Sequence, residues 1–464
     1  MVMKRRAGLL HLLALCVGLI VGYTWVTAAF GPSNRSFAHL STKGGAHVVH
    51  KVGYHKDFFP QSSGQDLTLK EEGQKNTHQG LQGEGDGGNT KSEESTSSSK
   101  DQEKVTDKKK KKRLFSNLSS IVSKKPRKPK SSGKYHMVVT ADQHVYNAWQ
   151  VQVCYHWYKK MKEEYPESDL GGFTRLLHTG QPDELMDVIP TVVVDPEPPE
   201  KERGYKVLNR PWAFQQFLEK TNISEEYIFM SEPDHLMLKP MPNWATPTKA
   251  AAFPFHYMKA QDDPKHPPII AHFNKKNVPL DKIFPTGNSP VIISKQQMKN
   301  LAPLWRQLAF EIDTYEPSKK YWGWVLEMWA FTISCSQQEP PIEFELHPEF
   351  MLQPPWDKVP QVNVCNDDGS KCGMKDGFIL HYTYGVDFDD DGESIYGKQD
   401  EHGRIVLGTW RFDKREFTQK YPTLETVPLP SHPNIKENHP LTYTLVEMIR
   451  DAIPDMKDTA RRPT

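Results

Sequence analysis

Residues 7–30 form a nearly unbroken apolar segment, and Lys4, Arg5 and Arg6 come directly before it. As a helix, this segment would rise about 36 Å at 1.5 Å per residue, which is enough to cross a bilayer. Because positively charged residues stay on the cytoplasmic side, we expect residues 1–6 to be a cytoplasmic tail and residues 7–30 a transmembrane signal-anchor. A cleaved signal peptide is the alternative, although its apolar core usually has only about 7–15 residues. The pattern favours a single-pass type II membrane protein.

Residues 31–134 show neither helical nor strand periodicity, and Gly, Ser, Gln, Lys and Glu dominate them. Such a segment cannot bury enough apolar surface to offset its chain entropy. We interpret it as a flexible lumenal stem. Its basic run at residues 108–113 is of a kind that binds nucleic acid in other proteins. The transmembrane segment and a net charge of only +1 argue against such a partner, which leaves a solvated stem or contact with an anionic polysaccharide or membrane surface.

From residue 135 onward, strand patterns alternate with helical patterns. Apolar runs at residues 136–140, 173–177, 190–194 and 226–230 predict strands, while residues 146–164 and 212–220 carry helical spacing. This alternation predicts an α/β fold with a mostly parallel central sheet. We place the folded domain at residues 135–430 and treat residues 431–464 as a C-terminal tail.

Aspartates stand in the turns that follow three of these strands, at Asp142, Asp195 and Asp234. Ligands of such sheets bind beyond the carboxyl ends of the strands. We therefore expect a ligand site at this edge of the sheet.

The turn at residues 232–235, EPDH, follows a buried strand and presents Glu232, Asp234 and His235 together. A Glu-x-Asp pair at a strand end resembles the Asp-x-Asp device with which nucleotide-sugar transferases hold Mn²⁺ or Mg²⁺ against a diphosphate. Carboxylate oxygens suit such hard cations, and the cation stabilises the charge that develops on the leaving diphosphate. Acid pairs are also common in ordinary turns, so this motif by itself leaves a structural role open.

Two further residues are candidates for the same chemistry. His381 ends a short apolar strand at residues 378–381, and its imidazole is a candidate metal ligand; the alternative is a core or capping histidine. Glu327 lies in an aromatic, helical stretch, so its carboxylate is expected either to have a raised pKa or to be paired. It would contact the acceptor or stabilise a cationic sugar, unless it is a surface residue of an amphipathic helix.

Polar residues near other predicted elements are candidates for binding a donor. Residues 287–290, GNSP, form a predicted polar turn that presents Asn288 and Ser289. Arg210 lies at the start of a predicted helix, where it would pair with a phosphate or a carboxylate. A plain turn and a structural arginine are the respective alternatives.

Cysteine usage fits a lumenal domain. Cys16 lies in the apolar segment, which leaves Cys154, Cys335, Cys365 and Cys372. Cys365 and Cys372 bracket a short polar loop, which suggests a disulfide, with two free thiols as the alternative.

Over residues 136–415 the chain resembles the plant and green-algal hydroxyproline O-arabinosyltransferases. The resemblance rests on ten blocks in the same order, at residues 171–178, 191–196, 203–214, 232–235, 252–255, 287–294, 323–328, 350–357, 381–385 and 410–415. It implies a GT-A-like fold and a type II protein of the Golgi apparatus membrane with its catalytic domain in the lumen. It also implies retaining transfer of L-arabinofuranose from UDP-β-L-arabinofuranose to the 4-hydroxyl of hydroxyproline in secreted proteins, including extensin-like cell-wall proteins.

With this resemblance, residue roles can be assigned. We expect Asp234, Glu232 and His381 to hold a divalent metal, Mn²⁺ or Mg²⁺, and Asp234 and Glu327 to act in catalysis. The expected donor-binding residues are Asp142, Asp195, Arg210, Asn288 and Ser289. The alternatives are a related serine O-galactosyltransferase and a non-catalytic lumenal protein that binds wall glycoproteins.

The chain also departs from the family pattern. Residues 358–376 and 389–408 look like insertions relative to the family, and Val386 stands where a cysteine is expected. These departures leave the choice of acceptor more open than the donor chemistry.

Overall fold

The computed structural model describes residues 133–354, 356–365 and 372–459. The predicted cytoplasmic tail, signal-anchor and nearly all of the predicted stem lie outside these residues. Within the described part of the chain, no helix combines the length and the apolar character needed to cross a membrane.

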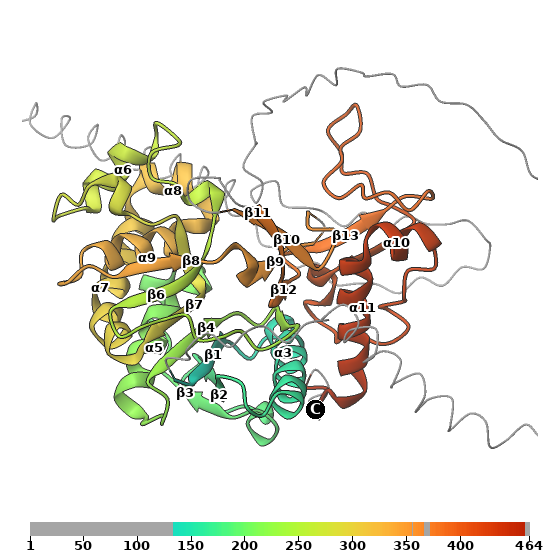
Figure 1. Ribbon diagram of the computed structural model, residues 1–464, viewed down its shortest axis with the longest axis horizontal. Helices are drawn as coiled ribbons and strands as arrows, with labels where there is room; N and C mark the ends of the chain where they lie inside the picture. The colour runs from blue at the N-terminus through green and yellow to red at the C-terminus, as the bar shows by residue number, and fades with distance from the viewer. Residues whose placement is uncertain (1–132, 355, 366–371, 460–464) are drawn as a thin grey trace, which may run out of the picture. The chain divides into compact units, whose positions relative to one another are not determined.

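A seven-stranded sheet forms the centre of the domain (Figure 1), in the order β3-β2-β1-β4-β7-β6-β8. The strands are β1 (Tyr135–Ala141), β2 (Leu170–Leu177), β3 (Thr191–Val193), β4 (Tyr227–Ser231), β6 (Lys249–Pro254), β7 (Thr286–Ser294) and β8 (Glu343–Leu346). Only β7 runs antiparallel to its neighbours β4 and β6; the other pairings in this sheet are parallel. The predicted α/β fold with a mostly parallel sheet is confirmed.

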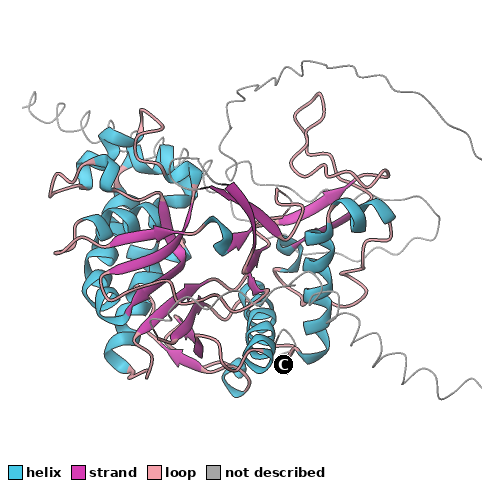
Figure 2. Cartoon of the chain, in the orientation of Figure 1, coloured by secondary structure: helices cyan, strands magenta, loops and turns pink. Residues whose placement is uncertain are grey.

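Helices cover both faces of this sheet (Figure 2). Along β1 the side chains alternate, so that Met137 and Val139 enter one core and Val138 enters the other. The first core is completed by α3 (Val145–Glu164) and α11 (Pro440–Ala452), and the second by α5 (Asn209–Lys220), α7 (Lys295–Thr314) and α9 (Leu326–Ser336). Shorter helices are α4 (Pro199–Glu202), α6 (His266–Phe273), α8 (Glu316–Trp322) and α10 (Pro433–Asn438).

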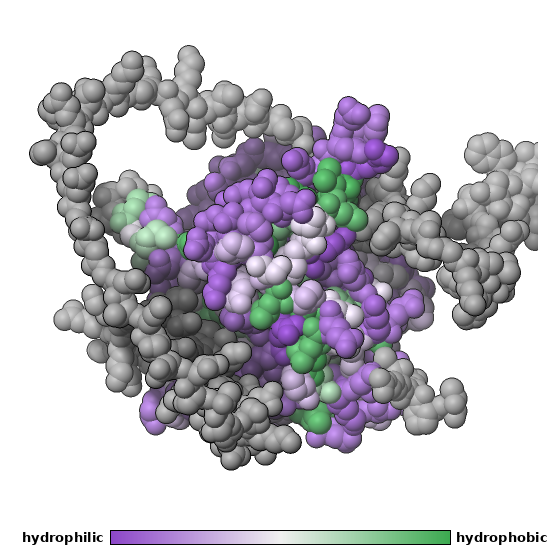
Figure 3. Space-filling model, turned by 90° about the vertical axis from the view of Figure 1, so that its right-hand side faces the viewer, coloured by the Kyte–Doolittle hydropathy of each residue, from purple (hydrophilic) through white to green (hydrophobic). Residues whose placement is uncertain are grey.

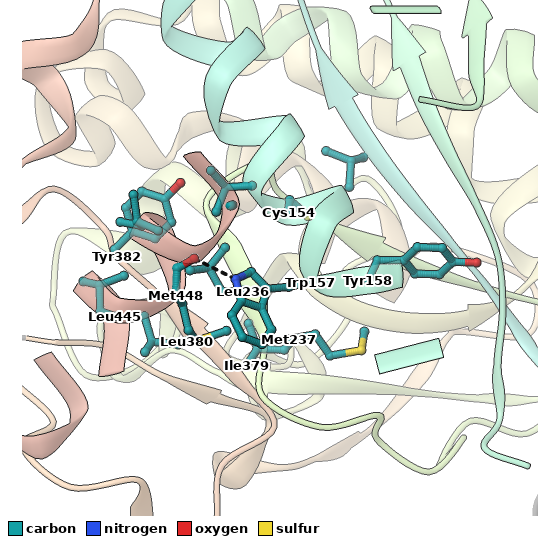
Figure 4. Close-up of a cluster of buried hydrophobic side chains, with 14 of the residues drawn as sticks. Cys154, Trp157, Tyr158, Leu236, Met237, Ile379, Leu380, Tyr382, Leu445 and Met448 are labelled. Carbon is teal, nitrogen blue, oxygen red and sulfur yellow. Dashed lines mark hydrogen bonds between the residues drawn. The ribbon is translucent and has the colours of Figure 1, made fainter. Parts of the chain in front are cut away.

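A small second sheet lies beside the first and positions two histidines. It has the order β5-β12-β9, with β5 (His235–Met237) antiparallel to β12 (Ile379–His381) and β9 (Met351–Leu352) parallel to β12. The register places His381 opposite His235. Figure 4 shows the hydrophobic cluster that supports this pairing, in which Leu236 and Leu380 pack with side chains of α3 and α11. Within it, the Trp157 indole donates a 2.9 Å hydrogen bond to the Met448 carbonyl.

Two β-hairpins complete the described strands. The first pairs β10 (Gln361–Cys365) with β11 (Cys372–Asp376), and a disulfide joins Cys365 to Cys372 at its end. The second pairs β13 (Gly385–Phe388) with β14 (Trp410–Asp413), and the short 3₁₀ helix η8 (Lys414–Phe417) follows directly. Cys154 and Cys335 are buried free thiols.

Residues 287–290 do not form the predicted turn. They belong to β7, which pairs with β4 over residues 291–294 and with β6 as far back as Thr286. The strand continues through these residues because β6 pairs with it back to Thr286 and all of its residues are buried. Gly287 packs against Met328, where a Cβ would lie 2.5 Å from the methionine methyl carbon. The Ser289 hydroxyl also donates to the Met230 carbonyl at 3.3 Å. Packing on both sides therefore outweighs the turn preference of this composition.

The folded domain also extends beyond residue 430, where a tail was predicted. Helix α11 places Leu441, Leu445, Met448 and Ala452 on one face, and all four are buried in the core against α3. This spacing is that of an amphipathic helix. The face of the molecule on the α10–α11 side of Figure 1 is largely hydrophilic where it is not covered, with scattered hydrophobic residues (Figure 3). The apolar side of α11 is therefore turned inward.

Candidate functional site

A cavity of about 360 Å³ opens at the edge of the central sheet where the parallel strands end. Thr140 comes from the end of β1, His178 follows β2, and the turn after β4 contributes Glu232 and Asp234. Because β7 is antiparallel, its first residues reach the same edge and contribute Asn288 and Ser289. The remaining wall residues are Tyr146, Asn147, Gln150, Lys206, Val207, Arg210, Pro233, His235, Phe255, Tyr257, Trp324, Met328, Gln353, His381, Thr383, Tyr384 and Lys414.

Four side chains in this cavity form a possible metal-binding group. Glu232, Asp234, His235 and His381 each offer a ligand atom, and these atoms all lie within 4.8 Å of one another. The turn between β4 and β5 presents the two acids, and a 3.1 Å hydrogen bond from the His235 amide to the Glu232 carbonyl closes it. Pairing of β5 with β12 brings His381 to the same point.

Asp234 is buried between two cationic or potentially cationic side chains. Its Oδ2 contacts the Lys414 ammonium and lies 3.2 Å from His381 Nε2. Burial alone would raise the pKa of Asp234, but Lys414 and His381 outweigh it, so this pKa lies well below the usual value for aspartate. Burial and the neighbouring His381 hold the pKa of His235 far below its usual range. Asp234 is therefore ionised and His235 is neutral at physiological pH.

Two polar atoms of this group are buried without a hydrogen-bond partner in the described part of the chain, which fits a site for a bound cation. Among the described residues, Asp234 Oδ1 and His381 Nδ1 are buried without a hydrogen-bond partner. An unsatisfied buried carboxylate oxygen costs free energy unless something fills its place. A carboxylate pair with neutral imidazole nitrogen is also a suitable donor set for a divalent metal.

Arg210 connects two acids at the other side of the cavity. Its guanidinium donates to Glu232 Oε1 at 2.9 Å and to Glu327 Oε2 at 3.0 Å. The side-chain amide of Asn288, oriented to satisfy both neighbours, accepts from Arg210 and donates to Glu327 Oε2 at 3.0 Å. Burial raises the pKa of Glu327 to about 7, although Arg210 acts in the opposite direction. Burial would lower the pKa of Arg210, but Glu327 and Glu232 outweigh it and raise that pKa.

Glu327 is not among the residues that line the cavity. It is the second residue of α9 and lies buried behind Arg210 and Asn288, which do line the cavity. From the sequence, this carboxylate is expected either to have a raised pKa or to be paired. In the structure its pKa is raised and it is also paired with Arg210. Its contact with the cavity is made through Arg210.

The two aspartates after β1 and β3 also lie outside the cavity lining. Asp142 accepts hydrogen bonds from the His144 amide at 3.0 Å and from the Asn147 side chain at 2.8 Å, and Asn147 lines the cavity. The side chain of Asp195 is 69% exposed and lies 3.5 Å from Lys220. The structure therefore brings Arg210, Asn288 and Ser289 into the cavity, keeps Asp142 behind Asn147, and leaves Asp195 at the surface.

Sequence reasoning assigned no role to several residues of this cavity. Lys414 stands in the block at residues 410–415, but nothing local indicates that it reaches Asp234, because 180 residues separate the two. Tyr257 and Trp324, whose rings lie 6.0 Å apart, form an aromatic wall. His235 was visible in the EPDH turn and joins the possible metal group.

Two family models match the chain. The hydroxyproline O-arabinosyltransferase family N-terminal domain matches residues 135–344, and the C-terminal domain of the same family matches residues 378–458. The N-terminal match contains the EPDH turn, Arg210 and Glu327, while the C-terminal match contains His381 and Lys414. The possible metal group is thus assembled from both matched regions.

Curated relatives cover most of this chain. It is 42% identical to Hydroxyproline O-arabinosyltransferase 2 of Arabidopsis thaliana over 71% of this chain and 83% of the relative. It is 42% identical to Hydroxyproline O-arabinosyltransferase RDN2 of Medicago truncatula over 69% and 81%, respectively. Among solved structures, a mutant of LgtC matches with a TM-score of 0.36 and 14% identity, over 53% of this chain and 87% of that one. The chain belongs to the hydroxyproline O-arabinosyltransferase family.

Proposed function

We propose that this protein transfers L-arabinofuranose from UDP-β-L-arabinofuranose to the 4-hydroxyl of hydroxyproline in secreted proteins. The observation that carries the proposal is the group formed by Glu232, Asp234, His235 and His381 in a cavity at the sheet edge, in a chain of this family. The product linkage is β, so the anomeric configuration is retained.

The fold supports a GT-A-type assignment. A mostly parallel sheet with one antiparallel strand ends at the cavity, and the acidic turn follows β4 directly. Open α/β sheets bind their ligands at this edge. Thr140, Arg210 and Asn288 line the cavity at this edge, and Arg210 Nε donates to the Thr140 hydroxyl at 3.3 Å. We assign these three residues to donor binding.

Glu232, Asp234 and His381, with His235 beside them, would hold a divalent cation, which we propose is Mn²⁺, with Mg²⁺ as the alternative. When bound, it supplies electrostatic stabilisation of the charge on the leaving diphosphate. The unpartnered Oδ1 of Asp234 is the atom that supports this assignment.

The transfer forms a bond between the acceptor hydroxyl oxygen and the anomeric carbon and breaks the bond from that carbon to the phosphate oxygen. The hydroxyl proton goes to the leaving phosphate oxygen. Both carboxylates that line the cavity in the described residues are paired with cations, Glu232 with Arg210 and Asp234 with Lys414. Paired with Arg210 or engaged as a ligand of the divalent cation, the two carboxylates are poor covalent nucleophiles, which supports attack from the leaving-group face.

Glu327 has a supporting role in this scheme. Its ion pair with Arg210 and its hydrogen bond to Asn288 fix two side chains of the cavity wall. The Arg210 guanidinium then orients the donor or the developing charge on it. Glu327 therefore acts as a positioning residue, although the sequence alone suggested direct contact with the sugar or acceptor.

We also propose that residues 7–30 anchor the protein in the Golgi membrane with the described domain in the lumen. The apolar length and the flanking Lys4, Arg5 and Arg6 support this orientation. Alkaline carbonate extraction and protease protection of intact microsomes test it. A protein released by carbonate, or digested without detergent, contradicts it.

The activity is tested with purified full-length protein, UDP-β-L-arabinofuranose and a hydroxyproline-rich peptide, in Mn²⁺ and in EDTA. We expect arabinosylated hydroxyproline only with the metal, and a fall in kcat/KM of at least about 100-fold for Asp234→Asn. Asp262→Asn, an exposed acid paired with Lys259, is the matched control. Transfer from UDP-galactose to serine would replace the donor and acceptor assignment, and absence of UDP binding would favour a binding protein.

A further inference from the structure

Lys414 is a buried lysine whose charged end lies in the cavity. Its side chain is only 7% exposed, and its backbone amide donates to the Tyr384 carbonyl at 3.0 Å. Because it follows β14 directly, the β13–β14 hairpin fixes its backbone. The ammonium group stands at the end of a four-carbon chain with several rotatable bonds, so it can be redirected without a movement of the backbone.

The ammonium of Lys414 occupies a place that suits a metal ion. It contacts Asp234 Oδ2, the oxygen that also lies 3.2 Å from His381 Nε2. Two members of the possible metal group, Asp234 and His381, therefore meet at the point where the lysine charge lies. A divalent cation bound to Asp234 would repel an ammonium group at this distance strongly, because the site is buried.

The other cations that line the cavity are held differently. Arg210 is fixed between Glu232 and Glu327 by two hydrogen bonds. Lys206 is 55% exposed and pairs with Glu202, four residues earlier in the chain. Within the described cavity wall, Lys414 is thus the buried cation whose charged end can leave its partner without breaking a two-acid bridge.

We propose that Lys414 is an internal countercation that holds Asp234 until a divalent metal arrives and then transfers its ammonium to the diphosphate of the nucleotide. The ligand is a nucleoside diphosphate together with a divalent cation, and this inference rests on the proposed function. Lys414 stays protonated throughout, so no proton is gained or lost. The exchange keeps a buried ammonium paired with an anion at each stage, which avoids the cost of an unpaired buried charge.

Two binding measurements on the purified full-length protein test this exchange. The first measures Mn²⁺ binding without nucleotide, from the free-Mn²⁺ electron paramagnetic resonance signal. The second measures UDP binding at saturating Mn²⁺ by calorimetry. For Lys414→Met we expect about tenfold tighter Mn²⁺ binding, because the competing cation is gone, and about tenfold weaker UDP binding, because a charge-assisted hydrogen bond to phosphate is lost.

Several controls separate this role from a structural one. Lys276→Met removes a cation that pairs with Glu339 and does not line the cavity, and it should change neither affinity by more than about threefold. Binding of uridine, which lacks phosphates, should be the same in the wild type and Lys414→Met. Lys414→Arg retains the charge and should keep UDP affinity within about threefold, which tests the proposal if Lys414→Met fails to fold.

Opposite changes in the two affinities of Lys414→Met support the exchange. Weakening of both affinities, or no change in either, overturns it, as does a loss of UDP affinity in Lys276→Met that matches that of Lys414→Met. Neither measurement uses an arabinose donor or a hydroxyproline acceptor. Failure of transfer with normal UDP binding would therefore count against the proposed function alone, whereas a wild-type protein that does not bind UDP would overturn both.

Discussion

Arg210 and Glu327 form a buried ion pair, with the guanidinium Nη1 3.0 Å from the carboxylate Oε2. The same guanidinium reaches Glu232 through its other terminal nitrogen at 2.9 Å. One cation therefore neutralises two acids, of which one lines the cavity and the other lies behind it. Loss of the arginine would leave both carboxylates without their cation, whereas loss of Glu327 leaves Arg210 still paired.

We expect Arg210→Met to lower the free energy of unfolding by about 3–5 kcal/mol, because it leaves the carboxylates of Glu232 and Glu327 without their cationic partner. The double variant Arg210→Met/Glu327→Gln should lose about 1–3 kcal/mol less than the sum of the single variants. Urea unfolding of the purified protein measures all three. Lys319→Met, from an exposed pair with Glu316, should change stability by less than about 0.5 kcal/mol. Additive losses would show that the pair is not coupled.

The contact between α3 and α11 should depend on acid pH. Asp451 accepts from His156 at 3.1 Å and contacts Lys160. Burial alone would raise the pKa of Asp451, but these two partners outweigh it and lower the pKa to about 2. The pKa of Asp451 is lower in the folded protein than its ordinary value of 3.8, so the ionised carboxylate stabilises the fold at pH values above 3.8. This contribution is lost as the pH falls through about 2.

We therefore expect Asp451→Asn to lower stability by about 1 kcal/mol at pH 7, a value reduced for partial exposure to solvent. This difference from the wild type should shrink between pH 4 and pH 2. Denaturant unfolding at several pH values checks it. Asp455→Asn is the control, because Asp455 faces the same His156 but its side chain is 68% exposed. A constant difference across this range would contradict the assignment.

Helix α11 should be required for stability. Leu445 is fully buried in the core shared with α3, so Leu445→Ala should cost about 2–5 kcal/mol. Thr444→Ala changes a partly buried neighbour on the same helix and should cost less than about 1 kcal/mol. Thermal unfolding of both variants tests the inclusion of this helix in the folded domain. Equal, small losses would restore the interpretation of residues 431–464 as a tail.

Metal and nucleotide should stabilise the wild type together. At ligand concentrations 100 times the dissociation constant, the gain is about 2.7 kcal/mol for a ligand that binds only the folded state. We expect a rise in the unfolding temperature with Mn²⁺ and UDP, its reversal by EDTA, and a much smaller rise in His381→Ala. His402→Ala, from an exposed loop, should respond like the wild type. An unchanged response of His381→Ala would remove that histidine from the metal group.

Local sequence was sufficient for much of the α/β core. The apolar run at residues 226–230 became β4 (Tyr227–Ser231), and the helical spacing at residues 146–164 became α3 (Val145–Glu164). Hydrophobic periodicity of this kind depends on neighbouring residues, so it is visible in the chain. The EPDH turn was also predictable from local sequence. It directly follows the apolar run of β4, and the residues that follow a strand lie at the edge of the sheet.

Other features depended on residues that are distant in sequence. Residues 287–290 have a turn composition, but burial and pairing with β6 make them part of β7. Glu327 could be placed on a helix, yet only the tertiary structure shows that Arg210 stands between it and the cavity. Sequence patterns contain no information about which distant side chain will meet a given turn.

The sequence by itself determined the α/β alternation, the acidic turn after β4 and the family of the chain, because these reside in local patterns and ordered motifs. The tertiary structure decided which cations meet the acids. Lys414 reaches Asp234 because β14 ends beside the β5–β12 pair, and this depends on packing of the C-terminal segments against α3. Charges in a buried site are balanced by neighbours in space, whereas the sequence shows only neighbours along the chain.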